Sequence, residues 1–294
     1  MYRIFLIIFF IISEVASAQT LFTYDASGNR LKKTTIAAGG CSTGMVVFSG
    51  KVLLQGPYNT TTNLMNNSLN SLGILQSFAA LQPYNNTNFN YKGEEVVGQK
   101  FFSNNAAIVD WLLLELRDPN VPSAAVATKA VFIKQDGTIV DTSGTNIVIT
   151  FAGVPDGRYF VVVRHRNHLA IRSTAVLNFS EGPQYYDFTT SGSNAYQSQS
   201  YASMVQVGNV WAMRGGNATS KTSVKYNGPG NAQNQILNIK LGGSLSAVLS
   251  NVYASEDVNM NGNVKWNGPG NDQNFLLNIV LGGSLSAVIN EQIQ

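Results

Sequence analysis

Oxygen-bearing side chains recur at every second position from Asp257 onward, a spacing that could coordinate a metal ion. Asp257, Asn259 and Asn261 stand at positions 1, 3 and 5 of this segment, and Gly262 follows at position 6. Calcium takes roughly six to eight oxygen ligands, and a loop supplies them by turning alternate side chains inward around a glycine. The backbone carbonyl of Asn263, at position 7, would add another oxygen. The spacing therefore predicts a calcium loop.

The carboxylate that would close this loop is Asp272, at position 16 of the same count. An EF-hand places its bidentate acid at position 12, but that position is Gly268 here. We expect residues 267–270 to loop out, so that Asp272 reaches the ion from the first turn of a helix capped by Asn271. Because only two carboxylates would neutralise the ion, we expect a Kd of roughly 10⁻⁴ to 10⁻³ M. The alternative is a turn rich in Asn and Gly, since these residues favour turns with or without metal.

This segment is the second copy of a tandem repeat. The 25 residues from Val224 recur from Val264, 40 positions later, and the two copies differ at five of those positions. The first copy lacks both carboxylates and has an ammonium group at one ligand position. Its aligned residues are Asn217, Thr219, Lys221 and Thr222, with Ala232 in place of Asp272. We therefore expect one calcium site, in the second copy.

The rest of the chain predicts strands. Residues 45–190 contain short runs rich in Val, Ile, Phe and Tyr, separated by turn sequences such as Gln135–Thr138. Such runs, with almost no helical period, predict a mostly β fold with an Ig-like antiparallel β-sandwich. We expect one short helix at 62–75. Residues 191–209 hold no charge and show no periodicity, which predicts a linker, and 210–294 would form a small loop-helix repeat domain.

A known group of proteins shares these features. Residues 256–278, EDVNMNGNVKWNGPGNDQNFLLN, resemble the tandem dockerin-like calcium repeats of secreted Bacteroidetes-type surface proteins. Residues 107–118 and 157–171 are similar to the β domain that precedes those repeats. In that group both copies usually carry the acidic ligands, so Asn217 is a departure. The resemblance implies a non-catalytic structural or interaction module, with a cohesin-like protein as one possible partner.

Residues 1–18 have the pattern of a Sec signal peptide. The apolar run Ile4–Ile12 precedes an A-x-A cleavage sequence at Ala16–Ala18, and it is shorter than the roughly 20 apolar residues that span a bilayer. We expect cleavage after Ala18 and a protein that is secreted or lies on the outer cell surface. We expect no transmembrane segment in the mature chain.

Residues 19–44 form a separate N-terminal piece. Its sequence FTYDASGNRLKK, residues 22–33, resembles a single YD repeat of the Rhs type. Because no second copy is present to pair with it, the resemblance implies an exposed N-terminal stub or a segment that adds a β-strand to a partner. Cys41 is the only cysteine of the chain, so no internal disulfide is expected.

The sequence offers no strong sign of catalysis. His165 and His168, the only histidines, end an apolar strand, and we expect them at a polar hairpin end exposed to solvent. Asp110 and Glu115 are an odd number of residues apart, so a strand would project them from opposite faces. The sequence contains no G-x-S-x-G, H-E-x-x-H, Walker or dinucleotide-binding motif. We predict that the protein is not an enzyme.

Other functions remain as alternatives. The net charge of +3 is spread along the chain without a basic patch, which predicts no nucleic-acid partner. Exposed aromatic side chains on one sheet face would indicate a carbohydrate-binding accessory module or adhesin. We expect Trp111, Trp211 and Trp266 to be core residues instead. An unrecognised hydrolase would need a pocket where two acids, or a histidine and a carboxylate, converge.

Overall fold

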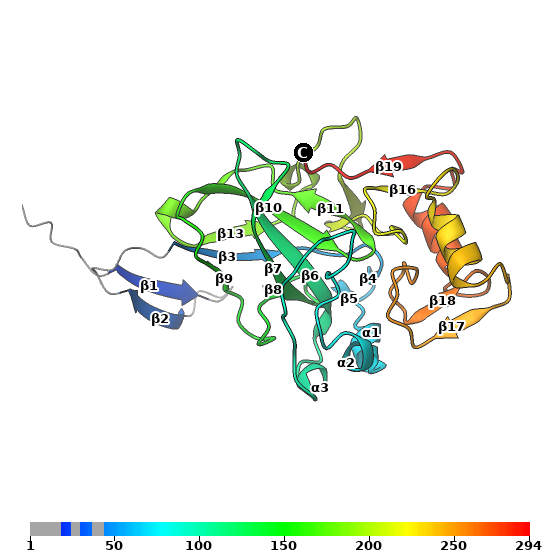
Figure 1. The fold of residues 1–294 in the computed structure, drawn as a ribbon, viewed down its shortest axis with the longest axis horizontal. Helices are drawn as coiled ribbons and strands as arrows, with labels where there is room; N and C mark the ends of the chain where they lie inside the picture. Colours follow the sequence, from blue (N-terminus) through cyan, green and yellow to red (C-terminus); the bar gives the residue numbers. More distant parts are fainter. Residues whose placement is uncertain (1–18, 25–29, 37–43) are drawn as a thin grey trace, which may run out of the picture. The chain divides into compact units, whose positions relative to one another are not determined.

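The computed structural model describes residues 19–24, 30–36 and 44–294 (Figure 1). The chain divides into two compact units, Met1–Thr43 and Gly44–Gln294. The expected signal peptide and Cys41 lie outside the described residues.

The first unit contains one β-hairpin. Strand β1 (Gln19–Tyr24) pairs with β2 (Arg30–Ile36) in antiparallel register. These strands hold the two ends of the YD-like sequence, and its residues 25–29 lie outside the described part of the chain.

In the second unit, a six-stranded antiparallel sheet and a three-stranded sheet contribute to one hydrophobic core. Along the larger sheet the order is β11 (His168–Arg172), β10 (Arg158–His165), β6 (Ile108–Arg117), β7 (Ala125–Lys134) and β8 (Ile139–Val140), and β12 (Leu177–Asn178) also pairs with β10. Along the smaller sheet the order is β13 (Gln184–Asp187), β3 (Met45–Lys51) and β9 (Ile149–Ala152), with β13 parallel to β3. Helix η1 (Phe179–Glu181) connects β12 to β13. The predicted mostly β fold is confirmed.

Strand β6 lies at the centre of the core. All ten of its residues are buried, which agrees with its apolar side chains on both faces. The ring of Trp111 packs against Phe132 of β7, with the ring centres 3.9 Å apart, and its indole N–H donates to the carbonyl of Ala79 at 2.8 Å. Trp111 is therefore a core residue, as expected.

Several short elements occupy the segment expected to be one helix. Strand β5 (Leu64–Met65), α1 (Ser68–Ser71) and the start of α2 (Ile74–Phe78) lie within it. Outside it, β4 (Tyr58–Asn59) pairs with β5, and α3 (Phe101–Asn104) follows later in the chain. Gly73 has a φ of +72°, which ends α1 and starts α2 in a new direction.

Residues 191–209 pack into the second unit, whereas the sequence predicted a linker. The segment contains η2 (Gly192–Asn194) and β14 (Met204–Val207), and β14 pairs with β15 (Val210–Met213). Ser198 and Gln199 donate their backbone N–H groups to the side chain of Gln292, at 2.7 and 2.9 Å. The structure differs from this prediction because the buried side chain of Gln292, near the far end of the chain, accepts hydrogen bonds from the backbone of this segment. Local composition does not reveal such a contact.

The two repeat copies exchange strands. Strand β16 (Ser223–Lys225) pairs with β19 (Val288–Asn290), and β17 (Val248–Ser250) pairs with β18 (Asn263–Lys265). The helical segments are η3 (Asn234–Lys240) in the first copy and α4 (Asp272–Asn274) with η4 (Phe275–Val280) in the second. Their equivalent residues Ile236 and Leu276 are fully buried in a second core. Among the described residues, no helix combines the length and apolar character that crossing a bilayer requires.

Candidate metal loop and the polar cluster beside it

The first predicted ligand, Asp257, is fully buried at the start of the second-copy loop. Its Oδ1 accepts the N–H of Asn261 at 3.0 Å, and its Oδ2 accepts the N–H of Gly262 at 2.8 Å. Gly262 has a φ of +84°, a conformation that glycine adopts without strain. The loop therefore turns back onto the Asp257 carboxylate.

The second predicted carboxylate, Asp272, is also fully buried. Its Oδ1 accepts the N–H of Val258 at 2.9 Å, and its Oδ2 accepts the N–H of Lys265 at 3.0 Å. Asn271 caps the helix that carries Asp272, because its Oδ1 accepts the N–H of Asn274 at 2.7 Å. Although residues 267–270 separate it from the loop, the side chain of Asp272 thus points back into the loop that begins at Asp257.

Burial and mutual repulsion act on the two carboxylates. Burial raises the pKa of Asp272 well above its usual value, and the negative charge of Asp257 raises it further. Burial raises the pKa of Asp257 to about 6, although Arg166 acts in the opposite direction. A divalent cation placed between two such groups would relieve both effects.

The remaining predicted ligands lie in the same loop and hydrogen-bond to its backbone. The Oδ1 atoms of Asn259 and Asn261 point along the loop and accept the N–H groups of Asn261 and Asn263, at 3.1 and 2.9 Å. Both side-chain amides donate to the carbonyl of Gly270, at 3.0 and 2.9 Å. Asn263 begins β18, and its side chain bonds to Asn261. The donor set contains only oxygen atoms, which fits calcium.

The predicted calcium ligands include no more than two carboxylates, Asp257 and Asp272. The described residues contain no group of three histidine, cysteine, aspartate or glutamate side chains placed to hold a metal ion. Amide and carbonyl oxygens would therefore supply the other bonds to calcium.

The first-copy loop keeps a similar turn without any carboxylate. Asn217 is buried, its Oδ1 accepts the N–H of Lys221 at 3.1 Å, and its Nδ2 donates to the carbonyl of Lys221 at 2.6 Å. Ala232, in the position of Asp272, is buried in the second core. The Oδ1 of Asn217 thus accepts the backbone N–H four residues later, as the Oδ1 of Asp257 does in the second copy.

The two histidines are buried, which corrects the expectation that they face solvent. His165 and His168 are 1% and 2% exposed. Their Nδ1 atoms lie 3.0 Å apart, and the Nε2 of His165 lies 3.2 Å from Oδ2 of Asp110. The backbone N–H of Gly56 donates to the Nε2 of His168 at 3.1 Å. The hairpin end is covered because the repeat unit packs over it.

Asp110 is the centre of this polar cluster. Arg166 donates from Nε to its Oδ2 at 2.9 Å, and the hydroxyl of Tyr253 donates to its Oδ1 at 2.6 Å. Burial alone would raise the pKa of Asp110, but Arg166 and His165 hold it at about 2. The cluster therefore pairs one buried carboxylate with one buried guanidinium. Glu115 has different partners, Arg117 at 2.6 Å and Arg164 at 2.5 Å, so it does not act with Asp110.

These contacts fix the protonation of both rings. Burial lowers the pKa of His165 and of His168, so both are neutral. His168 accepts at Nε2, so its proton is on Nδ1, within hydrogen-bond distance of Oδ1 of Asn167 at 2.8 Å and of the Nδ1 of His165 at 3.0 Å. The proton of His165 is on Nε2 and donates to Asp110. All four ring nitrogens have partners within the protein. The pair is thus a structural element, although a histidine and a carboxylate do converge.

The turn between the histidines contacts both repeat loops. The carbonyl of Asn167 accepts the N–H of Asn217 at 3.0 Å, and its Nδ2 donates to the carbonyl of Asp257 at 2.7 Å. Arg166 donates to the carbonyl of Ala254, and its own carbonyl accepts the hydroxyl of Ser220 at 2.5 Å. The sequence "RHRNH" gave no indication of this role, because a buried polar turn and an exposed one have the same composition.

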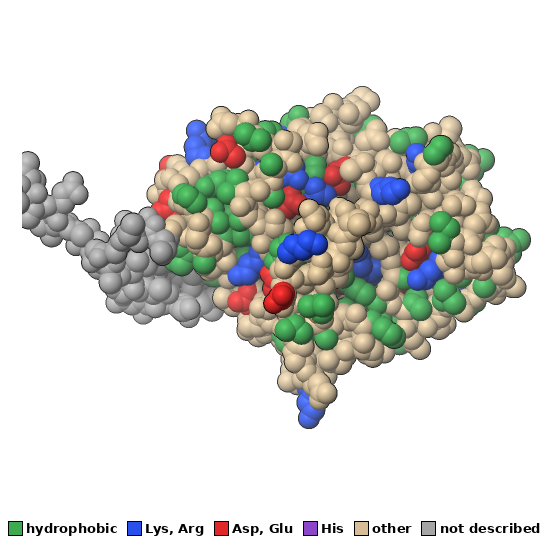
Figure 2. All heavy atoms as spheres, in the orientation of Figure 1, with side chains coloured by type: hydrophobic (Ala, Val, Ile, Leu, Met, Phe, Trp, Pro, Cys, Tyr) green, Lys and Arg blue, Asp and Glu red, His purple; other side chains and the backbone are tan. Residues whose placement is uncertain are grey.

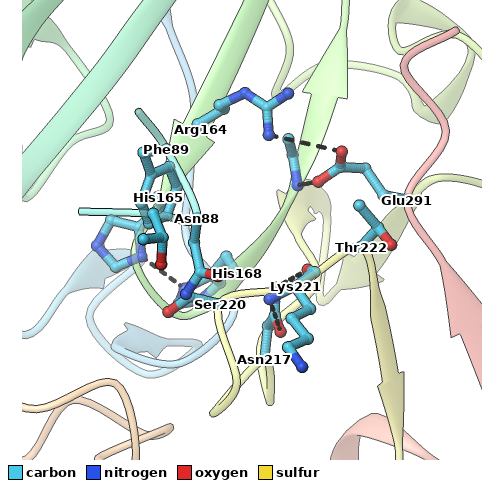
Figure 3. Close-up of a pocket in the computed structure, with 12 residues that line it drawn as sticks. Asn88, Phe89, Arg164, His165, His168, Asn217, Ser220, Lys221, Thr222 and Glu291 are labelled. Atoms are coloured by element: carbon cyan, nitrogen blue, oxygen red, sulfur yellow. Dashed lines mark hydrogen bonds and ion pairs between the residues drawn. The ribbon is translucent and has the colours of Figure 1, made fainter. Parts of the chain in front are cut away.

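A pocket of about 290 Å³ lies beside this cluster (Figure 3). Residues from β10, the first-copy loop and the loop at 87–89 line it, and Glu291 does so from the C-terminal segment. Arg164 and Glu291 form an ion pair there at 3.6 Å.

Comparisons with known proteins found no similarity on which to base a family assignment. No protein-family model matches the chain, and no curated protein or solved structure is significantly similar to it.

Proposed function

We propose that the protein is a secreted or outer-surface structural and interaction module, non-catalytic, whose C-terminal repeat unit is stabilised by one calcium ion. The observation that carries this proposal is the pair Asp257 and Asp272, two fully buried carboxylates that accept backbone N–H groups of the same loop. Secretion rests on the signal-peptide pattern at residues 1–18.

Calcium would act on stability in this proposal. Asp257, Asn259, Asn261, the carbonyl of Asn263 and Asp272 would hold the ion, which would supply the positive charge that the buried carboxylates lack. Because Asn167 bonds to the carbonyl of Asp257, an ordered second loop would also support the contact between the repeat unit and the sandwich.

The repeat unit offers a surface for a partner protein. Six large aliphatic side chains are exposed by 48–63%, and they form three pairs of equivalent positions, 40 residues apart. They are Ile239 and Ile279, Leu245 and Leu285, and Val248 and Val288. Figure 2 shows hydrophobic side chains over this part of the surface, at the right of the view. Scattered single apolar residues need no explanation, but a pattern that is duplicated in this way favours an interaction surface.

The charges around this surface point to an acidic partner. The acidic side chains of residues 210–294 are buried, at 11% exposure or less, whereas Lys221 is exposed and Lys225, Lys240 and Lys265 are partly exposed. Those acidic residues are Glu256, Asp257, Asp272 and Glu291. A protein with acidic groups around an apolar patch, such as a cohesin-like domain, is the partner that this surface favours.

The test of the calcium proposal is a melting curve with calcium and with chelator. At free calcium of roughly 10 to 100 times Kd, the wild-type chain should gain about 1.4 to 2.7 kcal/mol, a rise in Tm of roughly 3–10 °C. Asp257→Asn and Asp272→Ala should abolish this difference, and the second variant copies the residue that the first repeat has. Asn217→Ala, in the first-copy loop, is the matched control and should keep the difference. Equal melting temperatures of the wild type with calcium and with chelator would overturn the proposal.

A further inference from the structure

The pocket in Figure 3 is formed jointly by the sandwich and the repeat unit. Arg164 and the two histidines come from β10 and β11, Phe89 and Asn88 from a loop before β6, and Thr222 from the first-copy loop. Small-molecule sites are frequent at such junctions, and 290 Å³ is near the lower end of the roughly 300–1,000 Å³ that ligand sites span. The space therefore suits one small molecule.

The charges of the pocket wall are balanced. The guanidinium of Arg164 bonds to Glu115 at 2.5 Å and lies 3.6 Å from Glu291, so two carboxylates already face it. His165 and His168 are neutral, and their ring nitrogens are engaged. Lys221 also lines the pocket, but Figure 3 shows its side chain extending away from Arg164 and Glu291. Such a wall has no strong preference for an anion or a cation.

The polar groups of the wall suit hydroxyl groups. Arg164 offers donors, Glu291 offers acceptors, and the amide of Asn88 and the hydroxyl of Thr222 offer both. Planar groups such as guanidinium, carboxylate and amide can bond to two neighbouring hydroxyls at once.

One aromatic ring completes the wall. Phe89 is half-buried, and Tyr84 holds it in an edge-to-face contact with ring centres 4.9 Å apart. A fixed ring of this kind offers an apolar face on which the C–H groups of a sugar ring can pack. The three tryptophans offer none: Trp111 and Trp266 are buried, and Trp211 packs against Gly192.

We propose that this pocket binds a neutral sugar, either a monosaccharide or the terminal unit of a glycan. Arg164, Glu291, Asn88 and Thr222 would bond to its hydroxyls, and Phe89 would pack against its ring. The proposal goes beyond the structural role above and does not depend on calcium binding.

Saturation-transfer NMR tests this proposal on the full mature chain in calcium-containing buffer. The probes are glucose, galactose, mannose and N-acetylglucosamine at millimolar concentration, with citrate and spermidine as charged probes. We expect transfer to at least one neutral sugar, and loss of that transfer in Phe89→Ala and in Asn88→Leu. Asn85→Ala, an exposed change in the same loop that does not line the pocket, is the matched control and should keep it.

Three results would overturn the proposal: transfer to none of the neutral sugars, transfer only to citrate or spermidine, or sugar transfer that both pocket variants retain. Melting curves of the variants show whether each is folded. If Phe89→Ala unfolds, Asn88→Leu decides the test, because Asn88 is exposed and its side chain makes one long hydrogen bond, 3.5 Å to the carbonyl of Thr219.

Discussion

The side-chain amide of Asn167 donates to the backbone carbonyl of Asp257 at 2.7 Å. Through its own carbonyl, the same residue accepts the N–H of Asn217, so one buried asparagine bonds to the first residue of both repeat loops. The sandwich thereby contacts the proposed calcium loop directly.

Asn167→Ala should weaken that contact. It removes the amide from a buried site and leaves the carbonyl of Asp257 without this donor, which costs about 1–3 kcal/mol. Urea unfolding measures the loss, and calcium titration of the same variant should show weaker binding. The exposed Asn85→Ala should change the free energy of unfolding by less than about 0.5 kcal/mol. A stability of Asn167→Ala equal to that of the control would contradict this role.

The stabilising effect of calcium should grow as the pH rises through about 6. Burial raises the pKa of Asp257 to about 6 and raises that of Asp272 well above its usual value, and calcium binds only the deprotonated groups. Without metal, the folded chain holds these protons more tightly than the unfolded chain, so this pair makes folding less favourable as the pH rises from about 4.

Titration of the histidines changes the free energy of unfolding with pH in the direction opposite to titration of Asp257 and Asp272. The measurement must therefore separate the two effects. Burial lowers the pKa of His165 and His168, and their contribution is lost as the pH falls below about 6.5, the value in the unfolded chain. The difference in Tm between calcium and chelator, taken at each pH, cancels the histidine contribution. A difference that stays constant between pH 5 and pH 7 would exclude titrating carboxylates as the ligands.

The imidazole rings should remain neutral and keep fixed tautomers in the folded protein. Their contacts place the proton of His168 on Nδ1 and that of His165 on Nε2. Nitrogen chemical shifts at pH 7 should therefore be those of neutral rings with these tautomers, and any protonation in the folded protein should occur at lower pH than in urea, where both rings should titrate near 6.5. Titration of either ring in the folded protein at the same pH as in urea would show that the cluster is open to solvent.

Gly262 and Gly268 form a matched pair for testing how the loop packs. Their φ angles are +84° and +85°, so alanine is strained equally at both. A Cβ at Gly262 would lie 2.7 Å from Cδ1 of Ile74, whereas no atom lies within 4 Å of one at Gly268. Gly268→Ala should cost about 1–2 kcal/mol, and Gly262→Ala should cost more and also weaken calcium binding. Equal losses of stability in urea unfolding would mean that the loop at Gly262 does not pack closely against Ile74 of α2.

The sequence predicted the strands and the second-copy loop, which depend on local residue pattern. Short runs rich in Val, Ile, Phe and Tyr with turns between them indicated the strands, and the spacing from Asp257 indicated a loop closed by Asp272 with Asn271 as cap. Contacts between distant residues were not predictable in this way. The strand β6 carries Asp110 inside an apolar run, and only the fold reveals that Arg166, 56 residues away, neutralises it and that Tyr253, 143 residues away, donates a hydrogen bond to it.

The exchange of strands between the repeats makes them a single cooperative body. Strand β16 pairs with β19, and β18 pairs with β17. Deletion of either copy would therefore leave the strands of the other copy without hydrogen-bonding partners. One occupied ion would then hold both halves in place. In the proposed arrangement the first copy would need no carboxylates of its own to keep its loop in place.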